Sequence, residues 1–323
     1  MHPPYLRWRS HHAYNMPLGV PAMTGDFQLV YHDGAGYPEW GSRPRKPLVQ
    51  FDMAHQGEWL DSVIGPDVVT GKPMVYHIVR CELCIACHVW PLPEPQALAC
   101  YYAEQFYQAD KPDYVERYER DREWWEQAVH GPILQQCKGY LQLDCPEEDM
   151  VRFLDIGAGP GIALDVARQR FGWQTWGVEP NVSLCVRLEQ RDHYMIVGSL
   201  EESYFSCIGA LDGYGAYILY AYEVLEHQPC PEEFLLRCYD LLEEGGLLVC
   251  VVPNDYNPLQ LASQKKLGLG PWWLAPPQHL WMFTPATLKL LLRRTGFQIL
   301  DMRGTFPLEK FLLDGRCYVG NDT

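Results

Sequence analysis

The sequence contains no apolar run approaching the roughly 20 residues that a membrane-spanning helix requires. Residues 1–16, MHPPYLRWRSHHAYNM, also lack the apolar core of a secretory signal peptide. These two absences argue against a membrane-embedded helix and against an export signal. We therefore expect a cytoplasmic protein that has no membrane partner.

Positive charge is scarce in this chain. Its 323 residues include 26 Lys and Arg against 41 Asp and Glu, which gives a formal net charge of −15. A chain this acidic has no general electrostatic attraction for nucleic-acid phosphates or for anionic lipid. We therefore expect no nucleic-acid partner, and the sequence carries no signal of the oligomeric state.

Cysteine is absent from residues 1–80, although the chain contains 12 cysteines in all. Because there is no export signal, we expect these cysteines to be reduced thiols. Several of them lie in apolar segments, where cysteine behaves as a small core residue. Most of the cysteines are therefore predicted to be buried and to have no chemical role.

The chain divides by composition into three segments. Residues 1–48 are rich in Pro, Gly and aromatic residues and show no helical or strand period, which predicts an extended or partly disordered arm. Residues 49–143 start with short strand-like pieces and continue into helical patterns that open with Pro. Residues 144–323 alternate strand-like and helical patterns, and we expect this third segment to bind the ligand.

The alternation in the third segment predicts the fold class. The strand-like pieces are VRFLDIG, WQTWGVE, YMIVGSL, GAYILYAYEVLEH and LLVCVVPN, with helical patterns after the first, second and fourth of them. Apolar strands that alternate with helices over short connections favour a mostly parallel sheet covered on both faces. We predict a Rossmann-like, doubly wound α/β fold, in which ligands bind at the carboxyl ends of the strands.

A glycine-rich loop, LDIGAGPGI, follows the first of these strands and opens the next helix. Gly157, Gly159 and Gly161 allow a ligand to approach the backbone. The dinucleotide-binding motif needs glycine at position 162, which is isoleucine here, and the carboxylate of Asp155 would repel a pyrophosphate. A nicotinamide-dependent oxidoreductase is therefore disfavoured, while a tight turn without any ligand remains an alternative.

The next two strands also end in groups suited to a ligand. Glu179 ends the second strand, where a carboxylate can accept two hydrogen bonds from a ribose diol. After the third strand, residues 199–201 could border an adenine ring. These three strand ends suit an amino acid joined to a nucleoside without phosphates, which describes S-adenosylmethionine.

Residues 150–305 resemble class I S-adenosylmethionine-dependent methyltransferases, and most closely the branch with ubiquinone-biosynthesis and other small-molecule methyltransferases. The stretches that carry the resemblance are LDIGAGPG, GVEPN, EVLEHQPCPEEFLLRCYDLLEEGGLLVCVVPN and PPQHLWMFTPATLKLLLRRTGF. The resemblance implies methyl transfer from S-adenosylmethionine to an O, N or C nucleophile of a small-molecule metabolite. It also implies a seven-stranded sheet preceded by a helical lid. The last strand is expected to be short or missing, because little sequence follows FQILDMRGTF.

By this resemblance, the cofactor lies across the strand ends. Asp155 and the glycine loop hold its methionine end, Glu179 holds the ribose, and Tyr222 lines the cavity near the methyl group. The predicted cofactor-binding residues are Asp155, Gly157, Ala158, Gly159, Gly161, Glu179, Pro180, Ser199, Leu200, Glu201 and Tyr222.

Two histidines are candidate general bases for removing a proton from the acceptor. His227 follows the fourth strand, and His279 lies in an insert after the fifth strand that we expect to form the substrate wall. The alternative for each is structural, because His227 could cap or pack the next turn and His279 could pin its loop. A catalytically inactive, methyltransferase-like binding protein is the alternative reading of the whole chain.

The stretch HIVRCELCIACHVWPLP is the one motif outside this scheme. Zinc commonly takes two separated pairs of ligands, and Cys81 and Cys84 form one such pair. The segment resembles the second half of the small zinc ribbon of several related methyltransferases, but the first half is missing. His77, Cys87, His88 or Cys100 could complete a site; however, Cys87 and His88 are adjacent and cannot easily face one ion.

We expect this degenerate, zinc-ribbon-like segment to pack without a metal. A redox role is also disfavoured. A reactive Cys-x-x-Cys begins a helix, which lowers the pKa of the thiol, whereas this motif follows a strand-like run.

Overall fold

The computed structural model describes residues 5–10, 48–50, 56–82, 84, 86–141, 150–305 and 307–315. The chain forms two compact units, each built from separate stretches of sequence. Unit 1 comprises Met1–Trp8, Pro93–Val252 and Leu291–Met302, and unit 2 comprises Arg9–Leu92, Pro253–Leu290 and Arg303–Thr323. The boundaries predicted at residues 48 and 143 stay a prediction.

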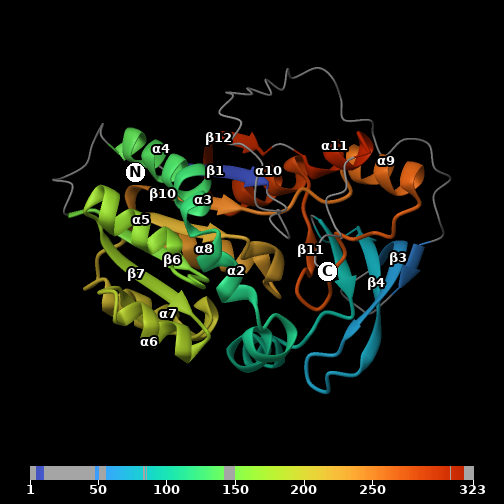
Figure 1. Ribbon diagram of the computed structural model, residues 1–323, viewed down its shortest axis with the longest axis horizontal. Helices are drawn as coiled ribbons and strands as arrows, with labels where there is room; N and C mark the ends of the chain where they lie inside the picture. Colours follow the sequence, from blue (N-terminus) through green and yellow to red (C-terminus); the bar gives the residue numbers. More distant parts are fainter. Residues whose placement is uncertain are drawn as a thin grey trace. The chain divides into compact units, whose positions relative to one another are not determined.

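Unit 1 is built on a sheet whose central five strands are parallel (Figure 1). Their order is β8-β7-β6-β9-β10, so the connections reverse direction between β6 and β9. Two further strands extend the sheet beyond β10, in the order β10-β1-β12. The sheet therefore has seven strands among the described residues. The strands are β1 (Tyr5–Ser10), β6 (Arg152–Ile156), β7 (Gln174–Glu179), β8 (Tyr194–Val197), β9 (Ala216–Tyr222), β10 (Leu242–Val251) and β12 (Gln298–Gly304).

Helices on both sides of this sheet bury its central strands (Figure 1). Five of the seven residues of β9 and the last six of β10 are buried, as near-continuous apolar strands require. The predicted Rossmann-like fold is therefore confirmed, while the tail at 317–323, where a last strand was sought, lies outside the described residues. The helices are α5 (Ile162–Phe171), α6 (Val182–Glu189), α7 (Leu200–Ala210), η4 (Leu225–His227), α8 (Pro231–Asp240) and α10 (Pro285–Arg294).

A helical segment precedes the sheet in unit 1, as the sequence predicts. Its aromatic side chains pack in a row, with Tyr118 stacked between Tyr114 and Trp125 at centroid distances of 4.5 and 4.6 Å. These side chains form an aromatic stripe along the helical segment. The helices are α1 (Pro95–Cys100), the π-helix η1 (Tyr101–Asp110), α2 (Tyr114–Arg120), α3 (Arg122–Trp124), the π-helix η2 (Trp125–His130) and α4 (Gly131–Leu141).

Unit 2 contains an antiparallel five-stranded sheet in the order β11-β5-β4-β3-β2. Its edge strand β11 comes from the insert after the fifth strand of unit 1 and pairs with β5, nearly 200 residues earlier in the chain. The sequence pattern does not indicate that these two strands pair. The elements are β2 (Leu48–Gln50), β3 (Gln56–Pro66), β4 (Pro73–Cys81), β5 (Cys87–Trp90), α9 (Pro258–Leu267), β11 (Trp281–Met282) and α11 (Leu308–Leu313).

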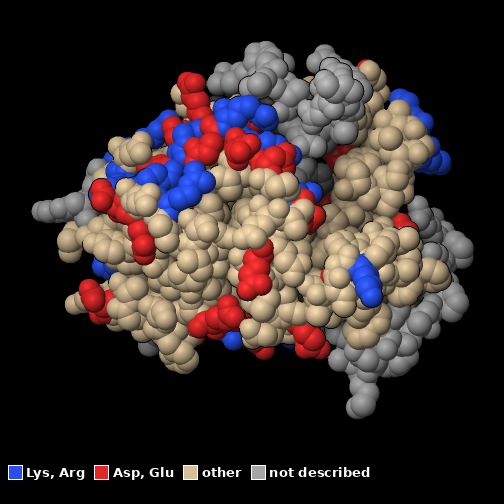
Figure 2. Space-filling model, turned by 60° about the horizontal axis from the view of Figure 1, so that its bottom comes forward, with Lys and Arg blue, Asp and Glu red and all other residues tan. Residues whose placement is uncertain are grey.

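Two further features concern the charges on the surface and the apolar character of the helices. On the face shown in Figure 2, basic and acidic side chains lie next to one another in the upper left of the view instead of forming a patch of one sign. Among the residues that the structure describes, none of the helices has both the length and the apolar character to cross a membrane.

Candidate functional site

The glycine loop joins β6 to α5 at the point where the sheet order reverses. Gly157, Gly159 and Gly161 all have positive φ angles, of 69°, 51° and 77°. A Cβ atom on Gly161 would stand 2.1 Å from Leu188 Cδ2, so neighbouring atoms exclude any side chain there. Beside Gly159, by contrast, the nearest atom to such a Cβ is the Tyr107 hydroxyl at 3.7 Å. An added methyl group at Gly159 would therefore make only ordinary van der Waals contacts, and Gly159 also lines a small pocket.

Glu179, at the end of β7, binds directly to this loop. Its Oε2 accepts a hydrogen bond from the Gly159 amide and its Oε1 one from the Asn181 amide, both at 2.9 Å. Burial raises the pKa of Glu179 to about 7, against the opposing effect of these bonds and of one from Tyr107. Glu179 therefore changes its charge near neutral pH and keeps lone pairs for a ligand.

Asp155 is a second buried carboxyl group, one strand away at the end of β6. Its exposed fraction is 4%, and burial, followed by repulsion from Glu179, holds its pKa well above the ordinary value. Two buried carboxyl groups side by side are costly unless positive charge or hydroxyl donors approach them. The pair therefore suits a ligand with a cationic group and hydroxyls, and it disfavours a phosphate.

The third strand end has a clear local role. The Ser199 hydroxyl accepts from the Glu202 amide, and the Glu202 carboxylate accepts from the Ser199 amide, which together form a capping box at the start of α7. Leu200 is buried, and Glu201 forms a 3.8 Å ion pair with Arg237. The capping signature was readable in GSLEES, whereas contact of residues 199–201 with adenine stays a prediction.

Aromatic side chains surround Tyr222, where β9 ends. Its ring centroid lies 5.2 Å from that of His130 and 6.1 Å from that of Trp125, both on the helices before the sheet. The neighbouring Tyr220 shares a 2.8 Å hydrogen bond with His130 Nδ1. The helical segment thus reaches the strand end at which the cavity residue was predicted.

His227 lies in the short helix η4 just beyond β9. Its Nδ1 is 3.1 Å from the hydroxyl of Tyr102, and its Nε2 is 3.7 Å from a carboxylate oxygen of the fully buried Glu226. Both ring nitrogens of His227 thus lie close to a polar side chain of unit 1. The role of His227 as a general base stays a prediction.

The helical segment supplies two residues that the sequence analysis missed. Tyr102 contacts His227, and Tyr107 contacts both Glu179 and the space above Gly159. Both belong to the π-helix η1, whose wider turn changes which residues share a face. The predicted helical period therefore did not indicate them, although the density of tyrosines in CYYAEQFYQ was a usable signal.

An ionic network fixes this segment to the back of the glycine loop. Asp165 on α5 binds Arg122 at 2.7 Å, Arg191 at 2.8 Å and His193 at 3.0 Å. Burial acts to raise the pKa of Asp165, but the bonds from His193 and Arg122 outweigh it and leave the pKa below the ordinary value. The carboxylate is therefore charged and holds two arginines in place.

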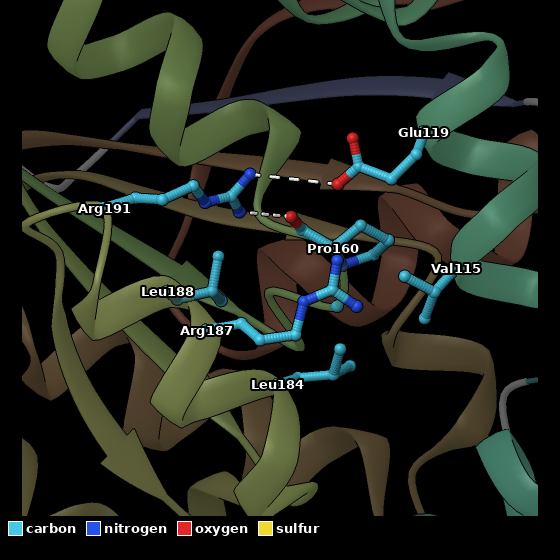
Figure 3. Close-up of a pocket in the computed structure, with 8 residues that line it drawn as sticks. Val115, Glu119, Pro160, Leu184, Arg187, Leu188 and Arg191 are labelled. Atoms are coloured by element: carbon cyan, nitrogen blue, oxygen red, sulfur yellow. Dashed lines mark hydrogen bonds and ion pairs between the residues drawn. The ribbon is translucent and has the colours of Figure 1, made fainter.

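A small pocket opens on this side of the loop (Figure 3). Figure 3 shows Arg191 directed at the Pro160 carbonyl and at Glu119, with Arg187 and Leu184 of α6 beside it. Gly159 and Pro160 line this pocket, and the hydrogen bond from Arg191 to the Pro160 carbonyl holds this part of the loop in place.

His279 belongs to unit 2, so its predicted role at the cofactor residues of unit 1 stays a prediction. It is 5% exposed, and its amide donates to the Ala275 carbonyl at 3.0 Å. The nearby Trp273 is buried and packs edge-on against Trp272 and Tyr256. Within unit 2, these aromatic residues pack the insert.

Comparison with known proteins supports the resemblance at the level of the family. Residues 135–301, just over half of the chain, match the family model described as a methyltransferase domain. A ubiquinone biosynthesis O-methyltransferase of Cereibacter sphaeroides is 29% identical over 161 residues, which is 48% of this chain and 63% of the relative. A second, of Roseobacter denitrificans, is 28% identical over 165 residues, 48% of this chain and 62% of the relative. The match thus spans less than two thirds of these relatives.

Solved structures resemble the chain more distantly. An S-adenosylmethionine-dependent methyltransferase from Archaeoglobus fulgidus is 21% identical, with a TM-score of 0.38 over 54% of this chain and 69% of that one. A plantazolicin methyltransferase in complex with SAH is 14% identical, with a TM-score of 0.45 over 68% of this chain and 86% of that one. Because residues 135–301 match its family model over more than half of the chain, the chain belongs to the methyltransferase-domain family.

Proposed function

We propose that this protein is an S-adenosylmethionine-dependent methyltransferase that acts on an O, N or C nucleophile of a small-molecule metabolite. The observation that carries the proposal is the pair of buried carboxyl groups, Asp155 and Glu179, beside the glycine loop. At Gly159 this loop has room for an added methyl-sized group. The proposal agrees with the family to which residues 135–301 belong.

The residues of unit 1 fit each part of this cofactor. Asp155 is able to bind the amino group of the methionine end, because a buried carboxylate gains most from a cationic partner. Glu179 is able to accept from the ribose hydroxyls while it holds the Gly159 amide. Residues 199–201 stay the proposed neighbours of the adenine, and of these Leu200 is buried at the start of α7.

S-adenosylmethionine, when bound, supplies a methyl group that its sulfonium has already activated. The protein then has to align the acceptor with that methyl group and exclude water. We assign these tasks to Tyr222 and to the aromatic side chains of the helical segment, in particular His130 and Trp125 of η2, whose rings lie next to that of Tyr222.

We propose His227 as the general base for acceptors that lose a proton. Glu226 and Tyr102 lie close to its two ring nitrogens and fix the orientation of the ring. His279 is the second candidate, because it is the other histidine in the stretches that carry the family resemblance. The curated relatives are named as O-methyltransferases, so hydroxyl acceptors are the first to screen.

The two histidines can be separated with matched variants, His227→Gln and His279→Gln. If His227 is the base, its variant loses about 100-fold or more in kcat for a hydroxyl acceptor and keeps its affinity for S-adenosylhomocysteine. The same loss in the His279 variant, with His227→Gln unaffected, would move the role to His279.

The cofactor itself is tested by calorimetry with S-adenosylhomocysteine, NAD and NADP. We expect micromolar binding of S-adenosylhomocysteine only, and we expect Glu179→Gln to weaken it. The matched control is Glu189→Gln, because Glu189 lies exposed on the adjoining helix α6. Binding of NAD in place of S-adenosylhomocysteine would contradict the proposal.

A further inference from the structure

Three side chains that bind metals in other proteins meet in unit 2. Cys81 ends β4, Cys84 lies in the turn that follows, and His88 belongs to β5. Their sulfur and nitrogen ligand atoms all lie within 4.8 Å of one another. Cys81 and His88 are buried and Cys84 is half-buried.

The strand register explains why these three residues converge. Val79 pairs with His88 and Arg80 pairs with Cys87 across the antiparallel strands. Because side chains alternate between the faces of a sheet, Cys81 and His88 lie on the face of Val79, and Cys87 lies on the opposite face with Arg80. The adjacency of Cys87 and His88, which counted against a metal in the sequence, is therefore no obstacle.

Cys87 has a separate environment on its own face. Its sulfur accepts a hydrogen bond from the guanidinium of Arg80. Cys87 therefore serves as a matched control for the other two cysteines.

The hydrogen bond of His88 indicates which of its two ring nitrogens carries the proton. Nδ1 lies 2.8 Å from the Val89 carbonyl oxygen. A carbonyl can only accept, so Nδ1 carries the proton and Nε2 carries the lone pair. Metal-binding histidines are typically oriented in this way, with the second nitrogen bound to a carbonyl or carboxylate.

We propose that Cys81, Cys84 and His88 bind a zinc ion through two sulfurs and Nε2. Two thiolates and one imidazole are soft and borderline ligands that favour zinc over magnesium or calcium. Tetrahedral zinc with bonds of about 2.0–2.3 Å places its ligand atoms roughly 3.5–3.8 Å apart, so small side-chain adjustments suffice. The ion fixes the turn between β4 and β5, and this role is independent of the methyltransferase proposal.

The first test is the metal content of protein that carries no histidine tag. After incubation with zinc under reducing conditions and dialysis, mass spectrometry of the elements should find about one zinc per chain. Cys84→Ser and His88→Gln should lose most of it, while the matched variants Cys87→Ser and Cys100→Ser should keep it. A wild-type protein without zinc, or a Cys84→Ser variant that retains it, would overturn the proposal.

A second measurement keeps the proposal testable if the variants do not fold. Cobalt added to the wild-type protein should produce a sulfur-to-cobalt charge-transfer band and the strong visible bands of a tetrahedral site, both removed by one equivalent of zinc. Weak visible bands typical of octahedral oxygen ligands would contradict it. Binding of S-adenosylhomocysteine, measured in parallel, reports separately on the proposed cofactor site.

Discussion

At the scale of single residues, the account depends on two buried carboxyl groups. The sequence placed Asp155 and Glu179 at strand ends, because the apolar runs before them are easy to recognise. It could not indicate that burial raises the pKa of both groups, since burial depends on residues far away in the chain, such as Tyr107. Because these pKa values are raised, we expect the predicted contacts of Asp155 and Glu179 with the cofactor to depend on pH.

Cofactor affinity should therefore fall as the pH is lowered through about 7. Glu179 in the free protein has a pKa of about 7, so below that pH it is protonated and must lose its proton before it accepts from the ribose. The expected loss in S-adenosylhomocysteine affinity approaches about tenfold per pH unit below 7, with little change above it. Calorimetry between pH 5 and pH 8.5, on the order of one pH unit apart, measures this slope.

The variant Glu179→Gln supplies the control, because it cannot titrate in this range. Its affinity should be lower than that of the wild type at pH 8, and it should lose the part of the slope that Glu179 causes. A slope in the variant equal to that of the wild type would assign the effect to another group, such as Asp155.

Alanine substitution can test whether the cofactor lies next to Gly159. Gly159 and Gly172 both have positive φ angles, of 51° and 68°, and neither has an atom within 3.4 Å of an added Cβ. Alanine at either position should cost about 1 kcal/mol in the free energy of unfolding, because of backbone strain. Only Gly159→Ala should also weaken S-adenosylhomocysteine binding, by at least tenfold, because its methyl group occupies the space assigned to the cofactor. Equal affinities in the two variants would refute that assignment.

At the scale of elements, local pattern predicted well and distant pairing did not. The strands ending in Asp155 and Glu179 and the helices opening with Pro have clear signatures within the segment itself. Strand β11 is only two residues long, and its partner β5 lies nearly 200 residues earlier, so no local pattern could indicate the pair. The face on which each residue of η1 lies was also missed, because a π-helix departs from the usual period.

The Asp165 network should contribute strongly to stability, because it holds the helical segment to the sheet. Asp165→Ala leaves Arg122 and Arg191 without their buried partner, and we expect a loss of about 3 kcal/mol in the free energy of unfolding. Glu233→Ala, which breaks an exposed pair with Arg237, should cost less than about 1 kcal/mol. Urea unfolding of the two variants measures both values.

The same network predicts the direction of a pH effect. The pKa of Asp165 is lower in the folded protein than in the unfolded chain, where it is about 3.9. Its stabilisation is therefore present above about pH 4 and is lost as the pH falls through the folded value. The difference between wild type and Asp165→Ala should shrink in acid, and a difference that grows there would contradict this assignment.

At the scale of the whole molecule, the sequence identified the family from residues 150–305, most of which belong to unit 1. The match covers residues 135–301, and the cofactor residues predicted within it lie at successive strand ends of one sheet. The acceptor was not predictable, because the insert that was expected to bind it forms a strand and a helix of unit 2. The convergence of Cys81, Cys84 and His88 likewise depends on strand register, which the spacing of cysteines does not reveal.

The most direct test of the account is transfer of a labelled methyl group. Full-length protein is incubated with S-adenosylmethionine labelled in the methyl group and with a small-molecule fraction of cell extract, and products are separated by mass. The account predicts that a small molecule gains one labelled methyl group with the wild type, and that Glu179→Gln greatly slows the reaction. Tight binding of S-adenosylhomocysteine with no labelled product from any extract would contradict it and would indicate a binding protein without catalysis.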